Sequence, residues 1–202
     1  PVGCTGPIVD PTPHASSTKY TGGVTAICAG SNAYPGAGIL AATGAVRATP
    51  SMVRVIDNDA VVPHLPEVVP HPSAEDKVHA QAWVVGPGRG TDEAAARELR
   101  AVLDRELPTI LDADALTLLA QNAELRDRVR AHPCAILTPH AGEFRRLYEA
   151  TLGRELDLSE GVGPRQRELA EDLDCFILHK GRITTVTAPG QAIYGMNAGH
   201  SY

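Results

Sequence analysis

Short apolar runs alternate with segments of helical periodicity along most of the chain. Strands are predicted where the apolar runs have the length and composition of buried strands, at 23–29, 52–56, 82–85, 109–111, 134–137 and 175–178. Helices are predicted at about 37–48, 91–106, 114–131 (as two short helices) and 164–172, and also after Pro139. A hairpin-like pair covers 183–188 and 191–196. This alternation predicts an α/β fold, in which a mostly parallel central sheet has helices on both faces.

Two stretches lack this periodicity. Residues 1–22 are rich in Pro, Gly, Thr and Ser, and we predict an irregular amino-terminal arm followed by one domain over 23–202. Residues 57–80 are rich in proline and are predicted to be loops with little regular structure.

Small, polar and charged residues follow the predicted strands with unusual regularity. They form the segments Gly30–Gly38, Gly86–Gly90, Asp112–Asp114, Thr138–Glu143 and Lys180–Thr184. Right-handed crossovers place the carboxyl ends of parallel strands along one edge of the sheet. Because ligands of open α/β sheets bind at that edge, these segments are the predicted site.

The most informative of these segments is Thr138-Pro139-His140-Ala141-Gly142-Glu143. A strand runs directly into a helix here, and we expect Thr138 to cap the helix and Pro139 to lie in its first turn. His140 and Glu143 then lie beside free backbone N–H groups. The alternative is that His140 is a solvated surface residue.

The other segments allow two interpretations each. Glycines at 86–90 could let a phosphate or ribose approach the backbone, or could serve only the turn. Asp112 and Asp114 could hold a hydroxyl group, a ribose or Mg²⁺, or Asp114 could be a helix N-cap. Lys180 could bind a phosphate as a point charge, or belong to a charged hairpin turn.

Composition limits the classes of function. At 202 residues and 43% hydrophobic, the chain can bury a core, and its net charge of −6 argues against nucleic acid as a partner. It has no stretch long and apolar enough for a membrane span and no signal segment at its start. The cysteines Cys28, Cys134 and Cys175 lie in apolar runs, so they are expected to be reduced and buried, in the cytoplasm. The spacing of Cys and His predicts no metal site made by the protein alone.

Taken in order, the segments resemble one family closely, the carboxyl-terminal dehydratase domain of the NAD(P)H-hydrate repair proteins, a branch of the ribokinase-like superfamily. The matching pieces are Lys19-Tyr20, Tyr34-Pro35-Gly36-Ala37, Val85-Gly86-Pro87-Gly88, Leu111-Asp112-Ala113-Asp114-Ala115-Leu116, Leu137-Thr138-Pro139-His140-Ala141-Gly142-Glu143-Phe144, Lys180-Gly181 with Thr184, and Asn197. The likeness covers nearly all of residues 19–202.

The resemblance implies a ribokinase-like three-layer sandwich and a lyase. Such a lyase uses ADP or ATP, with Mg²⁺, to dehydrate NAD(P)H hydrate (NAD(P)HX) back to NAD(P)H. It implies substrate binding by Ala37, Gly38, Gly88, His140 and Asp112, and nucleotide binding by Lys180, Gly181, Arg182, Ile183 and Thr184. It also implies an epimerase domain at the amino end of the full protein, and we expect a homo-oligomer.

The chain departs from the family pattern at several positions. The family has a Gly-x-Gly-Asp motif shortly after the Asn197 region, and its Asp is the expected general base. That position lies beyond Tyr202, so no catalytic residue is assigned. Thr18 stands where the family usually has His, and Arg89 stands where it usually has a small apolar residue. Gly38 stands where Ala is common in the family. Two alternative functions remain, a ribokinase-like kinase for a vitamin precursor or sugar, and a non-catalytic nucleotide-binding fragment.

Overall fold

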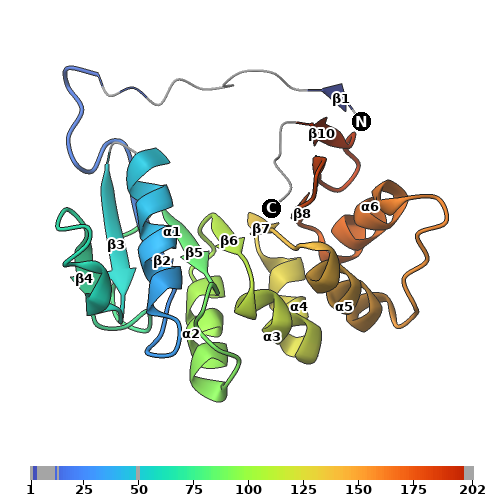
Figure 1. The fold of residues 1–202 in the computed structure, drawn as a ribbon, viewed down its shortest axis with the longest axis horizontal. Coiled ribbons are helices and arrows are strands. Elements are labelled where there is room, and N and C mark those ends of the chain that lie inside the picture. Colours follow the sequence, from blue (N-terminus) through green and yellow to red (C-terminus); the bar gives the residue numbers. More distant parts are fainter. Residues whose placement is uncertain (1, 4–11, 13, 49–50, 198–202) are drawn as a thin grey trace. The chain divides into compact units, whose positions relative to one another are not determined.

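The computed structural model describes residues 2–3, 12, 14–48 and 51–197 (Figure 1). The chain divides into two compact units, which we describe one at a time. The amino-terminal unit is Pro7–Thr109, and the carboxyl-terminal unit is Ile110–Tyr202 together with Pro1–Gly6.

The amino-terminal unit is a parallel sheet with helical connections. Its elements are β2 (Val24–Cys28), α1 (Pro35–Ala48), β3 (Met52–Ile56), the 3₁₀ helix η1 (Asp59–Val61), β4 (Val69–His71), β5 (Ala82–Val85) and α2 (Glu93–Leu103). The strands lie in the order β5-β2-β3-β4, and each neighbouring pair is parallel. Their carboxyl ends therefore lie on one edge, as predicted.

Helices α1 and α2 cover opposite faces of this sheet. Ile27 packs in one buried cluster with Ala42 of α1. The next residue, Cys28, is completely buried, and its thiol interacts with Glu98 of α2. Since successive side chains of a strand point to opposite faces, the two helices lie on opposite sides.

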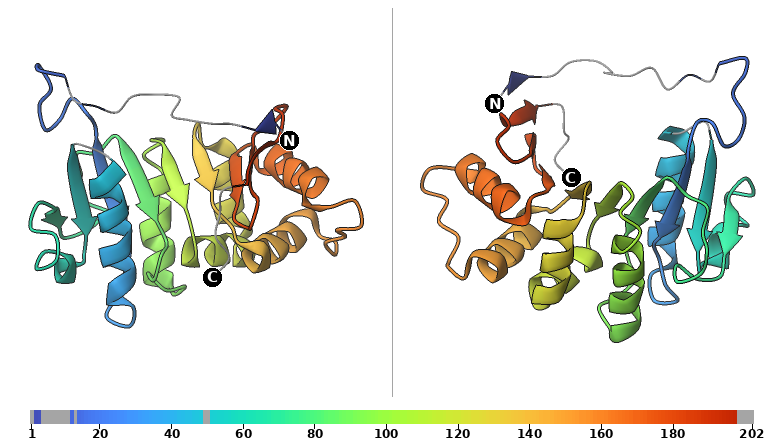
Figure 2. Two further views of the ribbon diagram at one scale, coloured as in Figure 1. Left: turned by 45° about the horizontal axis from the view of Figure 1, so that its top comes forward. Right: turned by 180° about the vertical axis from the view of Figure 1, so that it is seen from behind.

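The carboxyl-terminal unit combines parallel strands with an antiparallel end. Its elements are β6 (Thr109–Leu111, starting at the unit boundary), α3 (Asp114–Gln121), α4 (Ala123–Ala131), β7 (Ala135–Leu137), α5 (Ala141–Leu152), α6 (Val162–Leu173), β8 (Phe176–His179), β9 (Thr184–Thr187), β10 (Tyr194–Met196) and β1 (Val2–Gly3). The strands β6, β7 and β8 are neighbours in that order, and β8, β9 and β10 are antiparallel. The two views in Figure 2 show helices α5 and α6 next to the strands of this unit.

The predicted α/β fold is confirmed, and the predicted strands, helices and hairpin recur within a few residues. Two short strands were not predicted. β4 lies in the proline-rich stretch, where Pro70 is tolerated because β4 is the edge strand of the described sheet, next to β3. β1 lies in the segment expected to be irregular, and it pairs parallel with β10.

Cysteine burial follows the prediction only in part. Cys28 and Cys175 are buried free thiols, whereas Cys134, directly before β7, is half-buried. Cys4 lies outside the described residues. Within the described segments, every helix is too short or too polar to span a bilayer.

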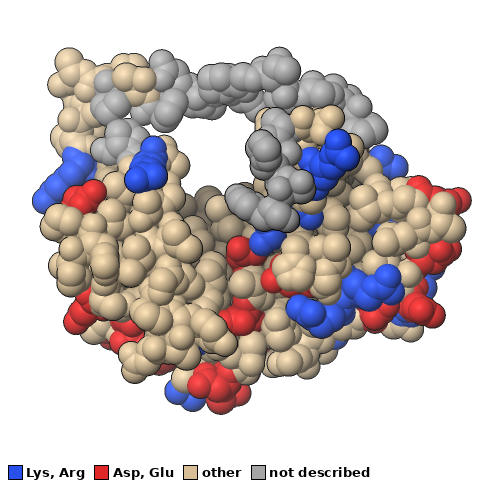
Figure 3. Space-filling model, in the orientation of Figure 1, with Lys and Arg blue, Asp and Glu red and all other residues tan. Residues whose placement is uncertain are grey.

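Acidic and basic side chains of the described residues are mixed on the face of the molecule that Figure 3 shows. Helix α4 gives two examples, since Arg128 lies 2.6 Å from Glu124 and Arg130 lies 2.6 Å from Asp127.

Candidate active site

His140, rather than Thr138, is the N-cap of helix α5. The backbone N–H of His140 donates to Glu143 Oε2 at 2.8 Å, and His140 Nδ1 accepts from the Gly142 N–H at 3.0 Å. Thr138 instead belongs to the strand connection, because its N–H donates to the Leu111 carbonyl at 3.0 Å. The expectation that Thr138 caps the helix is therefore wrong. A reciprocal capping box of the residues at N-cap and N3 starts the helix.

The capping box also fixes the state of the His140 ring. Because Nδ1 accepts a hydrogen bond, the proton of the neutral imidazole is on Nε2. This atom lies 3.3 Å from Glu143 Oε1. The His140 side chain is 55% exposed whereas that of Glu143 is only 8% exposed, so a buried carboxylate holds an accessible ring.

Lys180 lies beside the same turn. Lys180 pairs with His140 in a parallel bridge, and its N–H donates to the Pro139 carbonyl at 2.8 Å. Its Nζ lies 2.6 Å from Asp112 Oδ1 and 4.0 Å from Glu143 Oε2. Three segments distant in sequence thus place two carboxylates, an ammonium group and an imidazole in one cluster.

Asp112 lies in the turn directly after β6, next to a residue with unusual backbone geometry. Ala113 adopts a positive φ of 50°, which is uncommon for a residue other than glycine or asparagine. Asp114 then lies in the first turn of α3, and Ala113, not Asp114, is the N-cap residue. A strained backbone of this kind is often found at functional sites.

The remaining residues of the predicted nucleotide segment form the turn between β8 and β9. Gly181, Arg182 and Ile183 are exposed, and Ile183 is 52% exposed despite its apolar side chain. Thr184 Oγ1 donates to the Gly181 carbonyl at 3.4 Å. The turn therefore places three exposed residues directly after Lys180.

The predicted substrate residues of the amino-terminal unit also lie together. A Cβ atom on Gly88, where φ is +66°, would lie 2.8 Å from the Ala37 Cβ. One on Gly38 would lie 2.2 Å from Asn58 Nδ2 and 2.7 Å from the Ala29 carbonyl oxygen. The departure to glycine at position 38 thus has a packing reason, since Asn58 Nδ2 donates to that carbonyl at 2.9 Å.

Arg89, the other departure in this unit, is held by Glu98. Its Nε lies 2.8 Å and its Nη2 2.5 Å from the two carboxylate oxygens, and Nη1 donates to the Gly30 carbonyl at 3.0 Å. Burial alone would lower the pKa of Arg89, but the hydrogen bond and charge of Glu98 outweigh it and raise the pKa. Arg89 therefore stays charged and ties the turn after β2 to helix α2.

The donor set fits a magnesium ion carried by a nucleotide. Within the described residues, no group of three or more His, Cys, Asp or Glu side chains could hold a metal by itself. Mg²⁺ commonly uses one or two carboxylates together with substrate phosphates. Asp112 and Glu143 are the carboxylates nearest to Lys180 and could contribute in that way.

The sequence profile of the family described as NAD(P)H-hydrate dehydratase matches residues 25–202. The chain belongs to this family. Its His140 turn, Lys180 turn and Gly88 turn all lie within the matched range.

Individual relatives agree with this assignment. The bifunctional NAD(P)H-hydrate repair enzyme Nnr of Mycobacterium tuberculosis is 44% identical over 194 residues, which cover 95% of this chain and 39% of that protein. The ADP/ATP-dependent NAD(P)H-hydrate dehydratase of Bacillus subtilis, co-crystallised with ATP/Mg²⁺, has a TM-score of 0.77 and 29% identity, covering 94% of this chain and 69% of that one. A ribokinase-like superfamily protein of Enterococcus faecalis, at 20% identity and a TM-score of 0.71 over 91% of this chain and 66% of its own, shares the fold.

Two residues of the site, Asn58 and Glu98, were not predicted. Glu143 was singled out together with His140, but its role as the N3 residue of a capping box was not, although a Gln or Glu three residues after an N-cap is the signature of that motif. Asn58 and Glu98 had no local signal, since each acts on a segment far away in sequence. Their partners, Ala29 and Arg89, are brought to them only by the folded sheet.

Proposed function

We propose that the protein dehydrates NAD(P)H hydrate to NAD(P)H at the expense of ADP or ATP. Within the carboxyl-terminal unit, the cluster of Asp112, His140, Glu143 and Lys180 carries this proposal. The family of the chain and its fold agree with it.

The hydroxyl group of the hydrate is a poor leaving group, and the proposed chemistry first converts it into a good one. In the proposed reaction, the hydroxyl group on the reduced nicotinamide ring takes a phosphoryl group from the nucleotide. Phosphate then leaves with the C–O bonding electrons, a ring proton is lost, and the double bond of NAD(P)H is restored. Catalysis of phosphoryl transfer is mainly positioning and stabilisation of charge.

The residues of the cluster suit these tasks. Lys180, held at the rim by Asp112, supplies a cation for the transferring phosphoryl group, and the backbone from Gly181 to Thr184 binds the nucleotide. Glu143 holds the His140 ring, whose proton is on Nε2, and this ring contacts the hydrate. The Asp112 carboxylate contacts the hydrate as well. Ala37, Gly38 and Gly88 provide a surface without bulky side chains for the same substrate. Mg²⁺, bound with the nucleotide phosphates, would neutralise developing charge.

The experiment is recovery of NADH from its hydrate. Purified protein is mixed with NADH hydrate, Mg²⁺ and either ADP or ATP, and NADH is followed by its absorbance. We expect NADH to return only when nucleotide is present. Phosphorylation of a vitamin precursor or sugar alcohol without any return of NADH would contradict the proposal and favour the kinase alternative.

The wider setting is part of the same proposal. The chain spans 39% of the length of the bifunctional relative from M. tuberculosis. We propose that the whole protein also carries an amino-terminal epimerase domain, works in the cytoplasm and forms a homo-oligomer. Mass photometry of the whole protein tests the homo-oligomer, and an epimerase assay tests the amino-terminal domain.

A further inference from the structure

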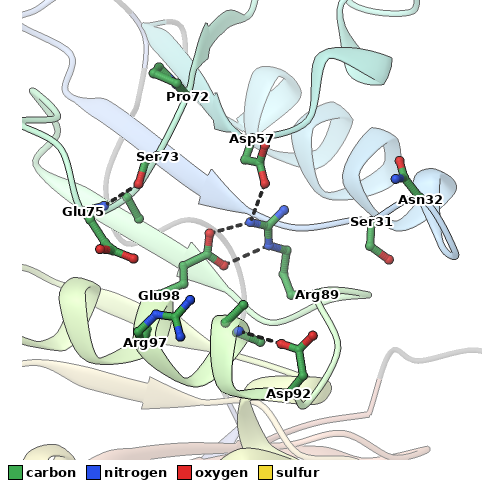
Figure 4. A pocket seen from close by; sticks show the side chains of 13 residues that line it. Ser31, Asn32, Asp57, Pro72, Ser73, Glu75, Arg89, Asp92, Arg97 and Glu98 are labelled. Carbon is green, nitrogen blue, oxygen red and sulfur yellow. Dashed lines mark hydrogen bonds and ion pairs between the residues drawn. The ribbon is translucent and has the colours of Figure 1, made fainter.

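The Arg89 side chain joins three segments of the amino-terminal unit. Arg89 lies in the turn after β5, and its Nε and Nη2 donate to the two carboxylate oxygens of Glu98 on α2 at 2.8 and 2.5 Å. Its Nη1 donates to the carbonyl of Gly30, in the turn after β2, at 3.0 Å. Figure 4 shows the guanidinium group of Arg89 between the carboxylates of Asp57 and Glu98. Each side chain of the Arg89–Glu98 pair is only 12% exposed, and a bidentate pair shielded from water is strong and directional.

Helix α2 gives this pair a firm anchor. Leu99, the neighbour of Glu98, is completely buried, and the Asp92 carboxylate caps the helix by accepting from the N–H of the buried Ala95 at 2.9 Å. The turn at Gly86–Gly90 is different, because it contains three glycines, all with a positive φ. Glycine loses more conformational freedom on ordering than any other residue, so this turn depends on outside contacts to hold one shape.

Backbone hydrogen bonds join the turns after β2 and β5. The Gly30 N–H donates to the Pro87 carbonyl at 2.7 Å, and the Gly86 N–H donates to the Cys28 carbonyl at 3.0 Å. Since Arg89 Nη1 holds the Gly30 carbonyl, Gly30 is bound through both its donor and its acceptor. A change in the orientation of Arg89 is therefore passed to both turns.

The joined turns carry and contact the proposed hydrate-binding residues of this unit. Gly88 belongs to one turn, and a Cβ atom added to it would lie 2.8 Å from the Ala37 Cβ. Gly30 belongs to the other, and a Cβ atom added to it would lie 2.8 Å from the backbone nitrogen of Gly38. With contacts this close, a shift of either turn also shifts the surface made by Ala37, Gly38 and Gly88.

We propose that the Arg89–Glu98 pair positions this surface for the hydrate. The proposal rests on the proposed function, and it makes Arg89 and Glu98 positioning residues rather than ligands of the substrate. Three nitrogens of Arg89 are already engaged by Glu98 and Gly30. The proposed nucleotide-binding residues Lys180–Thr184 belong to the carboxyl-terminal unit, so the pair should affect binding of the hydrate and not of ADP.

The first test measures the order of the two turns without catalysis. Arg89→Lys keeps a cation beside Glu98, but an ammonium group lacks the planar fork that binds two carboxylate oxygens and a carbonyl together. Hydrogen exchange with mass spectrometry should show about tenfold faster exchange than wild type in peptides covering 28–38 and 85–91, with α2 unchanged. The matched control is Arg97→Lys, at an exposed arginine of α2, which should exchange as wild type does.

The second test separates the two substrates by their KM values. In Arg89→Lys, KM for NADH hydrate should rise about tenfold, whereas KM for ADP should stay at the wild-type value. Glu98→Gln keeps one oxygen acceptor for the guanidinium group, so it should raise KM for the hydrate by less. A merely structural loss would lower the active fraction, and with it the apparent kcat, without separating the two KM values.

The outcomes distinguish this proposal from the proposed function. Wild-type exchange rates in Arg89→Lys, an unchanged KM for the hydrate, or an equal rise of both KM values would overturn the positioning role. If wild type restores no NADH, the proposed function fails, and calorimetric titration with NADH then tests the pair. Weaker NADH binding by Arg89→Lys than by wild type supports the positioning role, whereas equal binding, or none by either protein, overturns it.

Discussion

Lys180 Nζ and Asp112 Oδ1 lie 2.6 Å apart although 68 residues separate them in sequence. Lys180 remains 40% exposed and Asp112 27% exposed, so the pair is open to an incoming ligand. An ammonium group with one strong carboxylate partner is oriented yet still able to meet a phosphoryl oxygen, as the proposed role requires.

The Glu143 capping box is expected to contribute to stability. Glu143→Ala removes the acceptor of the His140 N–H and the carboxylate behind its ring, so the free energy of unfolding should fall by about 1 kcal/mol. Glu143→Gln keeps an acceptor at N3, so its free energy of unfolding should fall by less than that of Glu143→Ala. Urea denaturation of both variants checks this, and an unchanged Glu143→Ala would show that the box contributes nothing.

Glycine is required at position 38 but not at position 44 of the same helix. An alanine at 38 meets Asn58 and the Ala29 carbonyl, so Gly38→Ala should destabilise the protein by about 1–3 kcal/mol. At Gly44 an added Cβ meets nothing within 4 Å, and Gly44→Ala should be neutral or stabilise by up to about 1 kcal/mol. Thermal or urea unfolding measures both, and equal effects would contradict the packing argument.

His179 predicts a pH dependence of stability. Burial, and then the neighbouring His140, lower the pKa of His179 from its ordinary value of about 6.5. The unfolded chain therefore binds the proton more readily, and stability is full above about 6.5 and falls as the pH drops through the lowered pKa. His179→Gln should reduce this fall relative to wild type in urea denaturation across that range. An identical pH profile for the two proteins would rule out the contribution of His179.

The described cysteines should differ in reactivity. Burial, followed by the charge of Asp174, raises the pKa of Cys175 to about 12, and burial together with Glu98 raises the pKa of Cys28 well above its ordinary value. The thiolate is the reactive form, so native protein should be alkylated by iodoacetamide at Cys134 before Cys28 or Cys175. Peptide mass spectrometry with and without urea checks the order. Early modification of Cys28 would contradict it.

Much of the fold follows from periodicity alone. Runs such as 52–56 and 82–85 are too short and apolar for surface helices, and the amphipathic stretch at 91–106 has one apolar face, so strands and helices could be placed. β4 could not be placed in this way, because a strand of three residues around Pro70 is too short to show a hydrophobic periodicity. Its edge position is a property of the assembled sheet.

The site was predictable in its residue types more than in its contacts. Polar residues after each strand identified His140, Asp112 and Lys180, and the folded carboxyl-terminal unit brings these three together. The cap was misassigned to Thr138, because hydroxyl residues are favoured as N-caps whereas histidine is not. Neither Arg89–Glu98 nor Asn58–Ala29 has a signal in sequence, since both depend on how strands lie side by side.

The most direct test compares NADH recovery from NADH hydrate by wild type, Lys180→Gln and Lys77→Gln, with ADP or ATP and Mg²⁺. Lys77 is an exposed lysine and serves as the control. The account predicts nucleotide-dependent recovery by wild type and Lys77→Gln, and a loss of about 100-fold in kcat/KM for Lys180→Gln. Recovery by Lys180→Gln at the wild-type rate, or none by wild type, would contradict it.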